Sequence, residues 1–225
     1  AGATVFGLDL QPSIDKATPV ENVHLVATDV TKEDEVLAAI AEAVKAGPLR
    51  VAVNCAGVGW AGRILSKNGP HALDLFQTVI NINLVGTFNV MRLAADQMSK
   101  QEAVDEQGSR GLIVNTASVA AFEGQIGQIA YTASKGGVHA MTITAARDLA
   151  QFGIRVNTIL PGIFNTPLMN AAPPQVKDAL AASVPFPKRL GNPEEYARLA
   201  LEMCRNSYFN GEDVRLDGAI RMAPR

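Results

Sequence analysis

Short apolar runs alternate with helical patterns along this chain, and this alternation constrains the fold more than any other feature. Six runs have the length and the β-branched or apolar composition of strands. They span residues 3–9, 23–29, 50–54, 111–116, 154–160 and 212–217. Strands that alternate with helices build an α/β fold with a parallel sheet. At 225 residues, a single domain covering 1–225 is the simplest division, and it is long enough for a large core.

Composition and charge exclude several classes of protein. Hydrophobic residues make up 48% of the chain and charged residues 19%, which is typical of soluble globular proteins. The formal net charge of −2 provides no strong electrostatic footprint for nucleic acid, so we expect no nucleic-acid partner. No long uninterrupted apolar run and no basic-then-apolar N-terminal pattern occur. We therefore expect neither a membrane span nor a secretory signal.

The two cysteines, Cys55 and Cys204, are too few for a disulfide framework. We expect both to be buried free thiols in a reducing compartment. Cys55 has no histidine in a plausible partner pattern nearby, so it is interpreted as a packing residue rather than a nucleophile. No group of His and Cys residues has metal-ligand spacing, and no catalytic metal is expected.

The stretch SVAAFEGQIGQIAYTASK places Ser118, Tyr131 and Lys135 at spacings that suit one kind of chemistry. Tyr131 and Lys135 are four residues apart in a helical pattern, so they share a helix face. Ser118 ends the apolar run GLIVNTAS, which predicts a buried strand. The end of this strand and the helix that follows can therefore present all three groups to one small volume.

These groups suit the interconversion of an alcohol and a ketone. A free phenol has a pKa of about 10, and a fixed cation nearby favours the phenolate and lowers that pKa. Tyr131 assisted by Lys135 can then act as the acid and base, while the Ser118 hydroxyl holds the substrate oxygen. Tyr131 and Lys135 alone would also suit a core tyrosine and a solvated lysine; Ser118 thirteen residues upstream favours catalysis.

Other candidates follow the ends of predicted strands. Asp9 ends the first run, and in dinucleotide-binding folds an acidic residue there binds the adenosine ribose and repels a 2′-phosphate, which selects NAD. A loop carboxylate is the alternative. Asp29 ends the second run and could cap the helix that follows, bind a ligand, or do both. The small residues Asn54-Cys55-Ala56-Gly57 allow a ligand to approach the backbone closely, although an ordinary glycine turn would look the same.

The motifs NTAS, YTASK and NCAG resemble those of the short-chain dehydrogenase/reductase family. The longer strings NTASVAAFEGQIGQIAYTASKGG, VPFPKRLGNPEEYA and NGEDVRLDGAIRM resemble its type-2 3-hydroxyacyl-CoA dehydrogenase branch, also described as a short-chain 17β-hydroxysteroid dehydrogenase. The resemblance covers essentially the whole chain. It implies a Rossmann-like, doubly wound parallel sheet and an NAD-dependent oxidoreductase that interconverts 3-hydroxyacyl-CoA and 3-ketoacyl-CoA.

The resemblance leaves other activities open. Hydroxysteroids or other small secondary alcohols are alternative substrates. Epimerases and dehydratases of the family share the tyrosine and lysine but belong to longer chains with a larger substrate domain. A non-catalytic role is the alternative of another class, because one member of the branch is a scaffold subunit in transfer-RNA processing. The resemblance also implies a homotetramer located in the bacterial cytoplasm or the mitochondrial matrix.

The resemblance also implies roles for individual residues. Cofactor contacts are implied for Asp9, Asp29, Val30, Asn54, Cys55, Ala56, Gly57, Tyr131, Lys135, Pro161, Gly162 and Thr166. Asn83 would support a water linked to Lys135, so it is counted with the catalytic residues Ser118, Tyr131 and Lys135. Gln125 would face the substrate together with Ser118 and Tyr131. The segment 163–190, rich in small residues and proline, is predicted to be a mobile substrate lid.

The N-terminus lacks one part of a dinucleotide site. Such a site needs a glycine-rich turn between a first strand and its helix, about 20 residues before the acidic ribose ligand. No such glycine pattern occurs near residue 1. We therefore expect the first strand, its glycine-rich loop and the first helix to precede Ala1, with that strand lying between the strands that end at Asp9 and Asn54.

Overall fold

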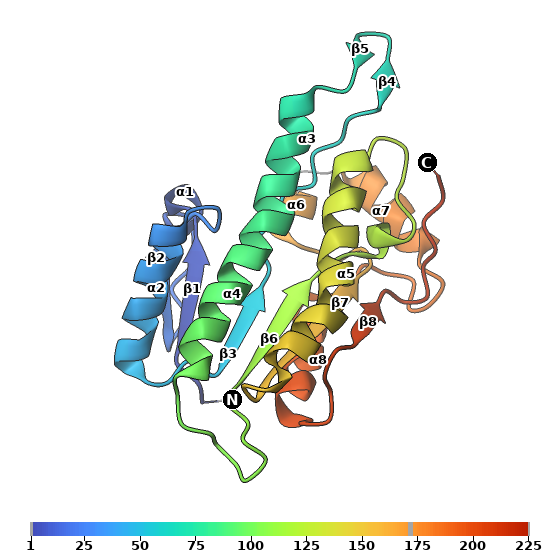
Figure 1. The fold of residues 1–225 in the computed structure, drawn as a ribbon. Coiled ribbons are helices and arrows are strands. Elements are labelled where there is room, and N and C mark those ends of the chain that lie inside the picture. Colours follow the sequence, from blue (N-terminus) through green and yellow to red (C-terminus); the bar gives the residue numbers. More distant parts are fainter. Residues whose placement is uncertain (1, 171–172, 225) are drawn as a thin grey trace.

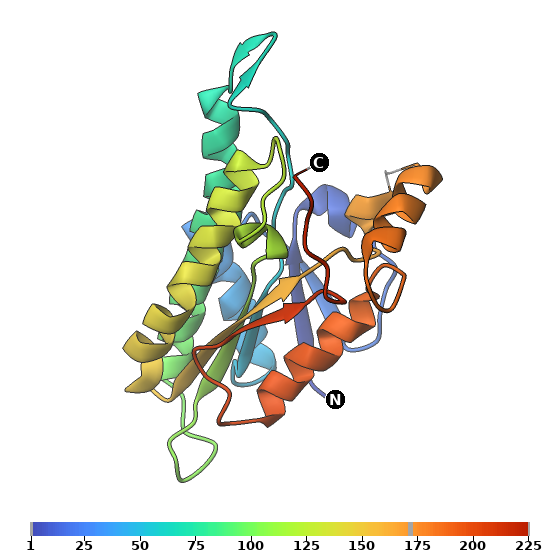
Figure 2. The same ribbon diagram turned by 90° about the vertical axis from the view of Figure 1, so that its right-hand side faces the viewer.

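Parallel strands form the centre of the molecule, and helices cover both of their faces (Figures 1 and 2). The computed structural model describes residues 2–170 and 173–224. Four parallel strands are hydrogen-bonded in the order β3–β6–β7–β8; they are β3 (Val51–Asn54), β6 (Gly111–Thr116), β7 (Ile154–Pro161) and β8 (Asp213–Leu216). Two further strands, β1 (Val5–Asp9) and β2 (Val23–Ala27), form a parallel pair of their own. The predicted α/β fold with a parallel sheet is confirmed, and the six predicted strands end within two residues of the observed bounds.

The helices and short elements complete the chain. They are α1 (Gln11–Ile14), α2 (Glu33–Ala46), the hairpin β4 (Leu65–Ser66) and β5 (Gly69–Pro70), α3 (Leu73–Ile80), a π-helical segment (Asn81–Val85), α4 (Gly86–Ser99), a 3₁₀ turn (Val119–Ala121), α5 (Ile129–Ala150), α6 (Pro167–Asn170), α7 (Pro174–Ser183) and α8 (Pro193–Arg205). Helices α3 and α4 follow one another without a break, joined by the π-helical segment (Figure 1). None of the helices in the described part of the chain combines the length and apolar character needed to cross a bilayer.

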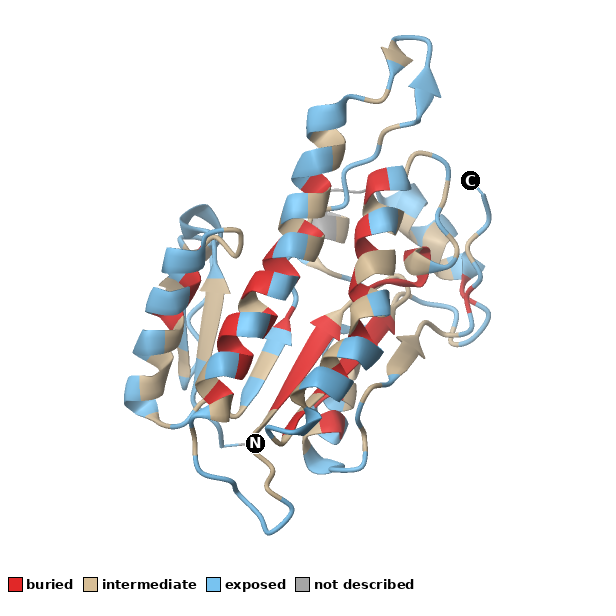
Figure 3. Ribbon diagram, in the orientation of Figure 1, coloured by how far each residue is buried: buried red, intermediate tan, exposed pale blue. Residues whose placement is uncertain are grey.

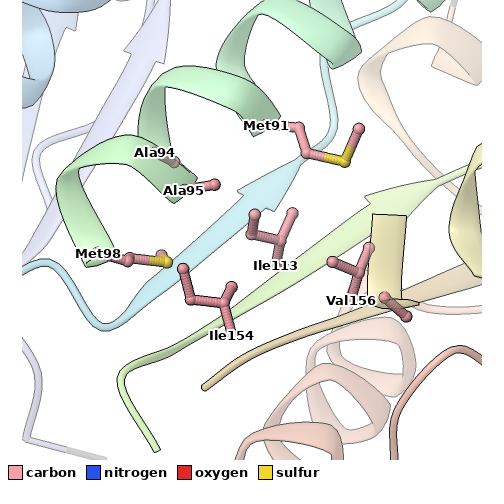
Figure 4. Close-up of a cluster of buried hydrophobic side chains, with 8 residues drawn as sticks. Met91, Ala94, Ala95, Met98, Ile113, Ile154 and Val156 are labelled. Atoms are coloured by element: carbon pink, nitrogen blue, oxygen red, sulfur yellow. The ribbon is translucent and has the colours of Figure 1, made fainter. Parts of the chain in front are cut away.

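Strand β6 is buried because its side chains alternate between two helical layers. Ile113 points toward α4 and α5, where it packs with Met91, Met98, Ile154 and Val156 (Figure 4). Its neighbours Leu112 and Val114 point the other way and pack against Ala200 and Met203 of α8. A strand with both faces covered is apolar along its whole length, which explains the continuous run LIV in the sequence (Figure 3).

A pair of asparagines lies within this apolar layer. The Asn54 amide donates to the Asn115 side-chain oxygen at 2.8 Å, which joins the ends of β3 and β6. Asn115 is fully buried and also contacts the Met91 sulfur at 3.8 Å. Because an unpaired buried amide costs about 1–3 kcal/mol, the pair fixes the register of the two strand ends that lead into the site.

The pair β1–β2 is held to the rest of the molecule through helix packing, since β1 and β3 share no hydrogen-bonded ladder in the described residues. Helix α2 lies against α4, and Arg92 forms an ion pair with Glu33 at 2.7 Å. The Asn89 amide donates to the Val30 carbonyl oxygen at 2.9 Å. These contacts fix the turn after β2, where cofactor contacts are predicted.

Candidate active site

Ser118, Tyr131 and Lys135 meet at the carboxyl end of β6. Ser118 begins the 3₁₀ turn just beyond the strand, and its hydroxyl accepts a hydrogen bond from Ala120 N at 3.2 Å. Tyr131 and Lys135 lie on the first two turns of α5. The Ser118 hydroxyl lies near enough to the Tyr131 phenol to lower the pKa of that phenol. The structure therefore brings the three residues together as their spacing predicted.

Lys135 is a buried cation with one protein acceptor in the described residues. It is 4% exposed, and its ammonium donates to the Thr116 carbonyl oxygen at 2.7 Å. The ammonium nitrogen lies 5.8 Å from the centre of the Tyr131 ring. Burial lowers the pKa of Lys135 to about 8, and this effect is partly opposed by the neighbouring Cys55. Lys135 can thus exchange a proton close to neutral pH.

The pKa of Tyr131 differs from the expectation. We expected Lys135 to lower it, whereas burial of the phenol raises it and the hydrogen bond from Ser118 lowers it by a smaller amount. The physical reason is that desolvation disfavours the phenolate more strongly than the surrounding groups stabilise it. In this structure the phenol is therefore held in its protonated form, ready to donate.

Asn83 joins the turn after β3 to helix α5. Its side-chain oxygen accepts from Val58 N at 2.8 Å, while its amide nitrogen donates to Val58 O at 2.9 Å and to the Ser134 hydroxyl at 3.0 Å. Asn83 is fully buried and belongs to the π-helical segment, a local structure that recurs at functional sites. The Asn83 amide therefore fixes the backbone of Val58 relative to helix α5. The support of a water relay by Asn83 remains a prediction.

Gly57 lies where a ligand could approach Lys135. A Cβ atom at this position would lie 3.1 Å from the Asn83 side-chain oxygen and 3.5 Å from the Lys135 ammonium. A side chain here would therefore crowd the Asn83 oxygen, while it would only touch the Lys135 ammonium. Gly162 is similarly confined, since a Cβ there would lie 2.8 Å from the Cα of Asp217.

The other predicted cofactor residues also follow strand ends on one edge, where the arrowheads of β1, β3 and β6 point (Figure 1). Asp9 ends β1 and is exposed, with one carboxylate oxygen accepting from Leu10 N at 2.7 Å. Asp29 accepts from the backbone and hydroxyl of Thr31, at 2.9 and 2.7 Å, so it fixes the turn into α2. Val30 packs against Gly86, where a Cβ would lie only 2.7 Å from its side chain. Ligands bind at this edge in open parallel sheets.

The remaining predicted cofactor residues lie around the same strand ends. Pro161 ends β7, and Thr166 precedes α6 with its carbonyl oxygen accepting from Met169 N at 2.9 Å. Ala56 and Cys55 are both exposed in the turn after β3. The expectation of a buried Cys55 is wrong, because the thiol lies at the end of the sheet rather than within it; Cys204 is partly buried.

Gln125 contacts the C-terminal segment. Its side-chain amide donates to Ala223 O at 3.0 Å, and Ile126 N donates to Pro224 O at 3.0 Å. Glu123, in the same loop, forms an ion pair with Arg215 at 2.9 Å. The loop after Ser118 is therefore covered by the chain's last residues, and a substrate contact of Gln125 remains a prediction.

The predicted lid 163–190 contains α6 and α7, and its residues 171 and 172 lie outside the described residues. A cavity of about 250 Å³ lies beneath this segment, lined among others by Ile163, Phe164, Val184 and Leu216. Arg189, Glu195 and Asp217 also line it, whereas Ser118, Tyr131 and Lys135 do not.

The sequence analysis missed Ser134, which lies within the YTASK string itself. Ser134 is fully buried and its hydroxyl donates to Tyr131 O at 2.7 Å. It also accepts the hydrogen bond from Asn83. Its place three residues after Tyr131, on the same helix face, was the available signal.

The low pKa of Lys135 predicts how stability depends on pH. Unfolding restores the ordinary value of 10.5 from about 8, so between these pH values the unfolded chain binds more protons than the folded protein. Stability contributed by Lys135 therefore rises with pH across this window, by up to about 3 kcal/mol, and is constant below it. Urea denaturation of wild type and Lys135→Met at pH 7.5 and 10 measures this. A difference in unfolding free energy that does not change between the two pH values would contradict it.

Comparison with known proteins agrees with this geometry. Residues 7–177 match the family model described as short chain dehydrogenase. The chain is 53% identical to the Bos taurus protein named 3-hydroxyacyl-CoA dehydrogenase type-2 and 52% identical to the Homo sapiens protein of that name, over 99% of this chain and 87% of each relative. A crystal structure of 3-hydroxyacyl-CoA dehydrogenase type-2 from Mycobacterium avium matches with a TM-score of 0.92 at 45% identity, covering 100% of this chain and 88% of that chain. The chain therefore belongs to the short-chain dehydrogenase family, which uses a nicotinamide dinucleotide.

Proposed function

We propose that the protein is an NAD-dependent dehydrogenase that interconverts 3-hydroxyacyl-CoA and 3-ketoacyl-CoA thioesters. The observation that carries this proposal is the contact of Ser118 and Tyr131 beside the buried ammonium of Lys135. A phenol, a hydroxyl and a cation around one small volume suit proton exchange with a secondary alcohol. The relatives named 3-hydroxyacyl-CoA dehydrogenase type-2 support the choice of substrate.

The residues present fit a nicotinamide dinucleotide. The turn at Gly57 leaves its backbone open beside Lys135, and the exposed carboxylate of Asp9 ends β1 on the same edge of the sheet. Asp29 and Val30 would border the adenine, with Asn54, Cys55 and Ala56 along the turn after β3. Pro161, Gly162 and Thr166 would lie beside the nicotinamide. The cofactor supplies or accepts the hydride when it is bound.

The protein's own groups handle the proton. Ser118 orients the substrate oxygen, and the Tyr131 phenol gives its proton to that oxygen during reduction or receives one during oxidation. Burial raises the pKa of Tyr131, which keeps the donor protonated in the direction of reduction. In the direction of oxidation the base is the Tyr131 phenolate, and the Lys135 ammonium stabilises it; in the direction of reduction the same ammonium stabilises the phenolate as it forms. Lys135 would also hold the nicotinamide ribose. Asn83 would support the relay that returns the proton to solvent.

The first test of this function is a substrate panel. We expect turnover of acetoacetyl-CoA and longer 3-ketoacyl-CoA thioesters, followed as NADH absorbance, with steroid and small ketones as the alternatives. Tyr131→Phe keeps the ring and removes the proton, so kcat should fall by about 10²–10⁴-fold. Tyr208→Phe is the matched control, because Tyr208 is 99% exposed. Turnover of steroids but no thioester would contradict the substrate, and nucleotide binding without any turnover would favour a non-catalytic scaffold subunit.

The second test concerns the choice of NAD. The Asp9 carboxylate would repel the 2′-phosphate of NADP, so wild type should show a higher kcat/KM with NAD. Asp9→Asn removes this charge, and kcat/KM with NADP should then rise roughly tenfold or more relative to NAD. Glu21→Gln is a control, since Glu21 is also exposed and precedes the neighbouring strand β2. An unchanged ratio in Asp9→Asn would remove Asp9 from the ribose site.

We also propose that the protein forms a homotetramer. Val85 and Phe88 are 45% and 48% exposed and lie three residues apart on one helix face. Large exposed apolar side chains on a packed helix are typical of surfaces that another copy covers. Sedimentation velocity should give a tetramer, and Phe88→Asp should shift it to smaller species; a monomeric wild type at micromolar concentration would contradict the proposal.

The free thiols support a reducing compartment, the bacterial cytoplasm or the mitochondrial matrix, which cell fractionation checks.

A further inference from the structure

Thr116 lies between the two helical layers and serves both of them. It is the last residue of β6, and side chains on this strand alternate between α4 and α5 on one side and α8 on the other. Leu112 and Val114 point toward α8, so the Thr116 side chain points that way as well. Its carbonyl oxygen instead accepts the hydrogen bond from Lys135 on α5. Whatever holds the Thr116 side chain therefore also orients the acceptor of Lys135.

The Thr116 side chain is held by Tyr196 of α8. The two hydroxyl oxygens are 2.7 Å apart, and the Thr116 hydroxyl also donates to the Cys55 sulfur at 3.5 Å. Either hydroxyl can be the donor in the shorter contact, and the Cys55 thiol also lies 4.0 Å from the Tyr196 oxygen. The Tyr196 ring packs in the cluster of Leu112 and Val114, which fixes its position. Burial raises the pKa of Tyr196, so its hydroxyl stays protonated.

The strand end is held by the sheet on one side only. Strand β3 ends at Asn54, opposite Asn115, and therefore gives Thr116 no ladder partner on that side. On the other side Thr116 is paired with Ile159 of β7, whose carbonyl oxygen accepts from Ala117 N at 2.9 Å. The contact with Tyr196 adds a side-chain restraint to the peptide whose carbonyl receives the Lys135 ammonium.

We propose that Tyr196 is a positioning residue for the catalytic lysine: through the Thr116 hydroxyl, it aims the Thr116 carbonyl at the Lys135 ammonium. This inference rests on the proposed role of Lys135 in the reaction. A well-aimed carbonyl acceptor favours the charged form of an amine. Tyr196 on α8 would then set the protonation of a group that belongs to α5, on the opposite face of the sheet.

The inference predicts a shift in the titration of Lys135 that needs neither substrate nor cofactor. The probe is the Cε resonance of Lys135 in protein made with ¹³C-labelled lysine, assigned by its absence in Lys135→Met. In Tyr196→Phe the carbonyl is held less firmly, the ammonium is less stabilised, and the midpoint should move to lower pH by about half a unit. Thr116→Val removes the other hydroxyl and should produce a shift of similar size.

Controls and kinetics separate this role from a structural one. The double variant Tyr196→Phe/Thr116→Val should shift the midpoint no more than either single variant, because both interrupt one contact. Tyr208→Phe, at the exposed tyrosine, should leave the midpoint unchanged. In Tyr196→Phe we expect kcat to fall about 3–10-fold, as for one lost hydrogen bond, with KM for the thioester little changed.

A Tyr196→Phe protein whose Lys135 midpoint equals that of wild type would overturn the inference. A lower melting temperature in the same protein, with kcat unchanged, would identify the contact as a merely structural hydrogen bond. Failure of the proposed function would look different: Lys135→Met would keep wild-type turnover while the midpoint still moved in Tyr196→Phe.

Discussion

The buried ammonium of Lys135 is the interaction on which the arrangement of the site depends. A cation that is 4% exposed keeps its charge only where acceptors meet it, and the Thr116 carbonyl does so at 2.7 Å. This requires three elements to keep fixed positions relative to one another: the end of β6, the first turns of α5 and the turn at Gly57. The Asn83 amide joins two of them by bonding both Val58 and Ser134. The contacts that pack these elements together therefore also set the geometry of the catalytic residues.

Burial shifts the pKa values of Tyr131 and Lys135 in opposite directions, and both shifts favour the neutral form. It raises the pKa of the phenol and lowers that of the amine, because each neutral form is easier to bury than its ion. The two groups are therefore pushed toward neutrality together. A negative charge on Tyr131 and a positive charge on Lys135 would offset each other when the proton moves, so the ion pair is best formed during the reaction itself.

Local sequence features predicted the strands and the helix that carry the site. They did not predict the contacts that residues make across the sheet. Strand β6 was predicted with its observed bounds because both faces are covered, which makes Leu112–Val114 a continuous apolar run. The Tyr131–Lys135 spacing gave a shared helix face from periodicity alone. The exposure of Cys55 and the raised pKa of Tyr131 depend on how much of each group the assembled elements cover. The contact of Thr116 with Tyr196 joins residues eighty positions apart, which no local pattern encodes.

The π-helical segment Asn81–Val85 takes up one extra residue between α3 and α4. A π turn holds one residue more than an α turn, so the surplus is contained within the wide turn. Removing one residue there would restore the regular repeat and leave α3 and α4 in their present rotational phase. Val79, fully buried in α3, would stay in the interior. Asn83 lies in the wide turn and bonds both Val58 and Ser134, so a single-residue deletion would displace its amide while the packing of the two helices persists.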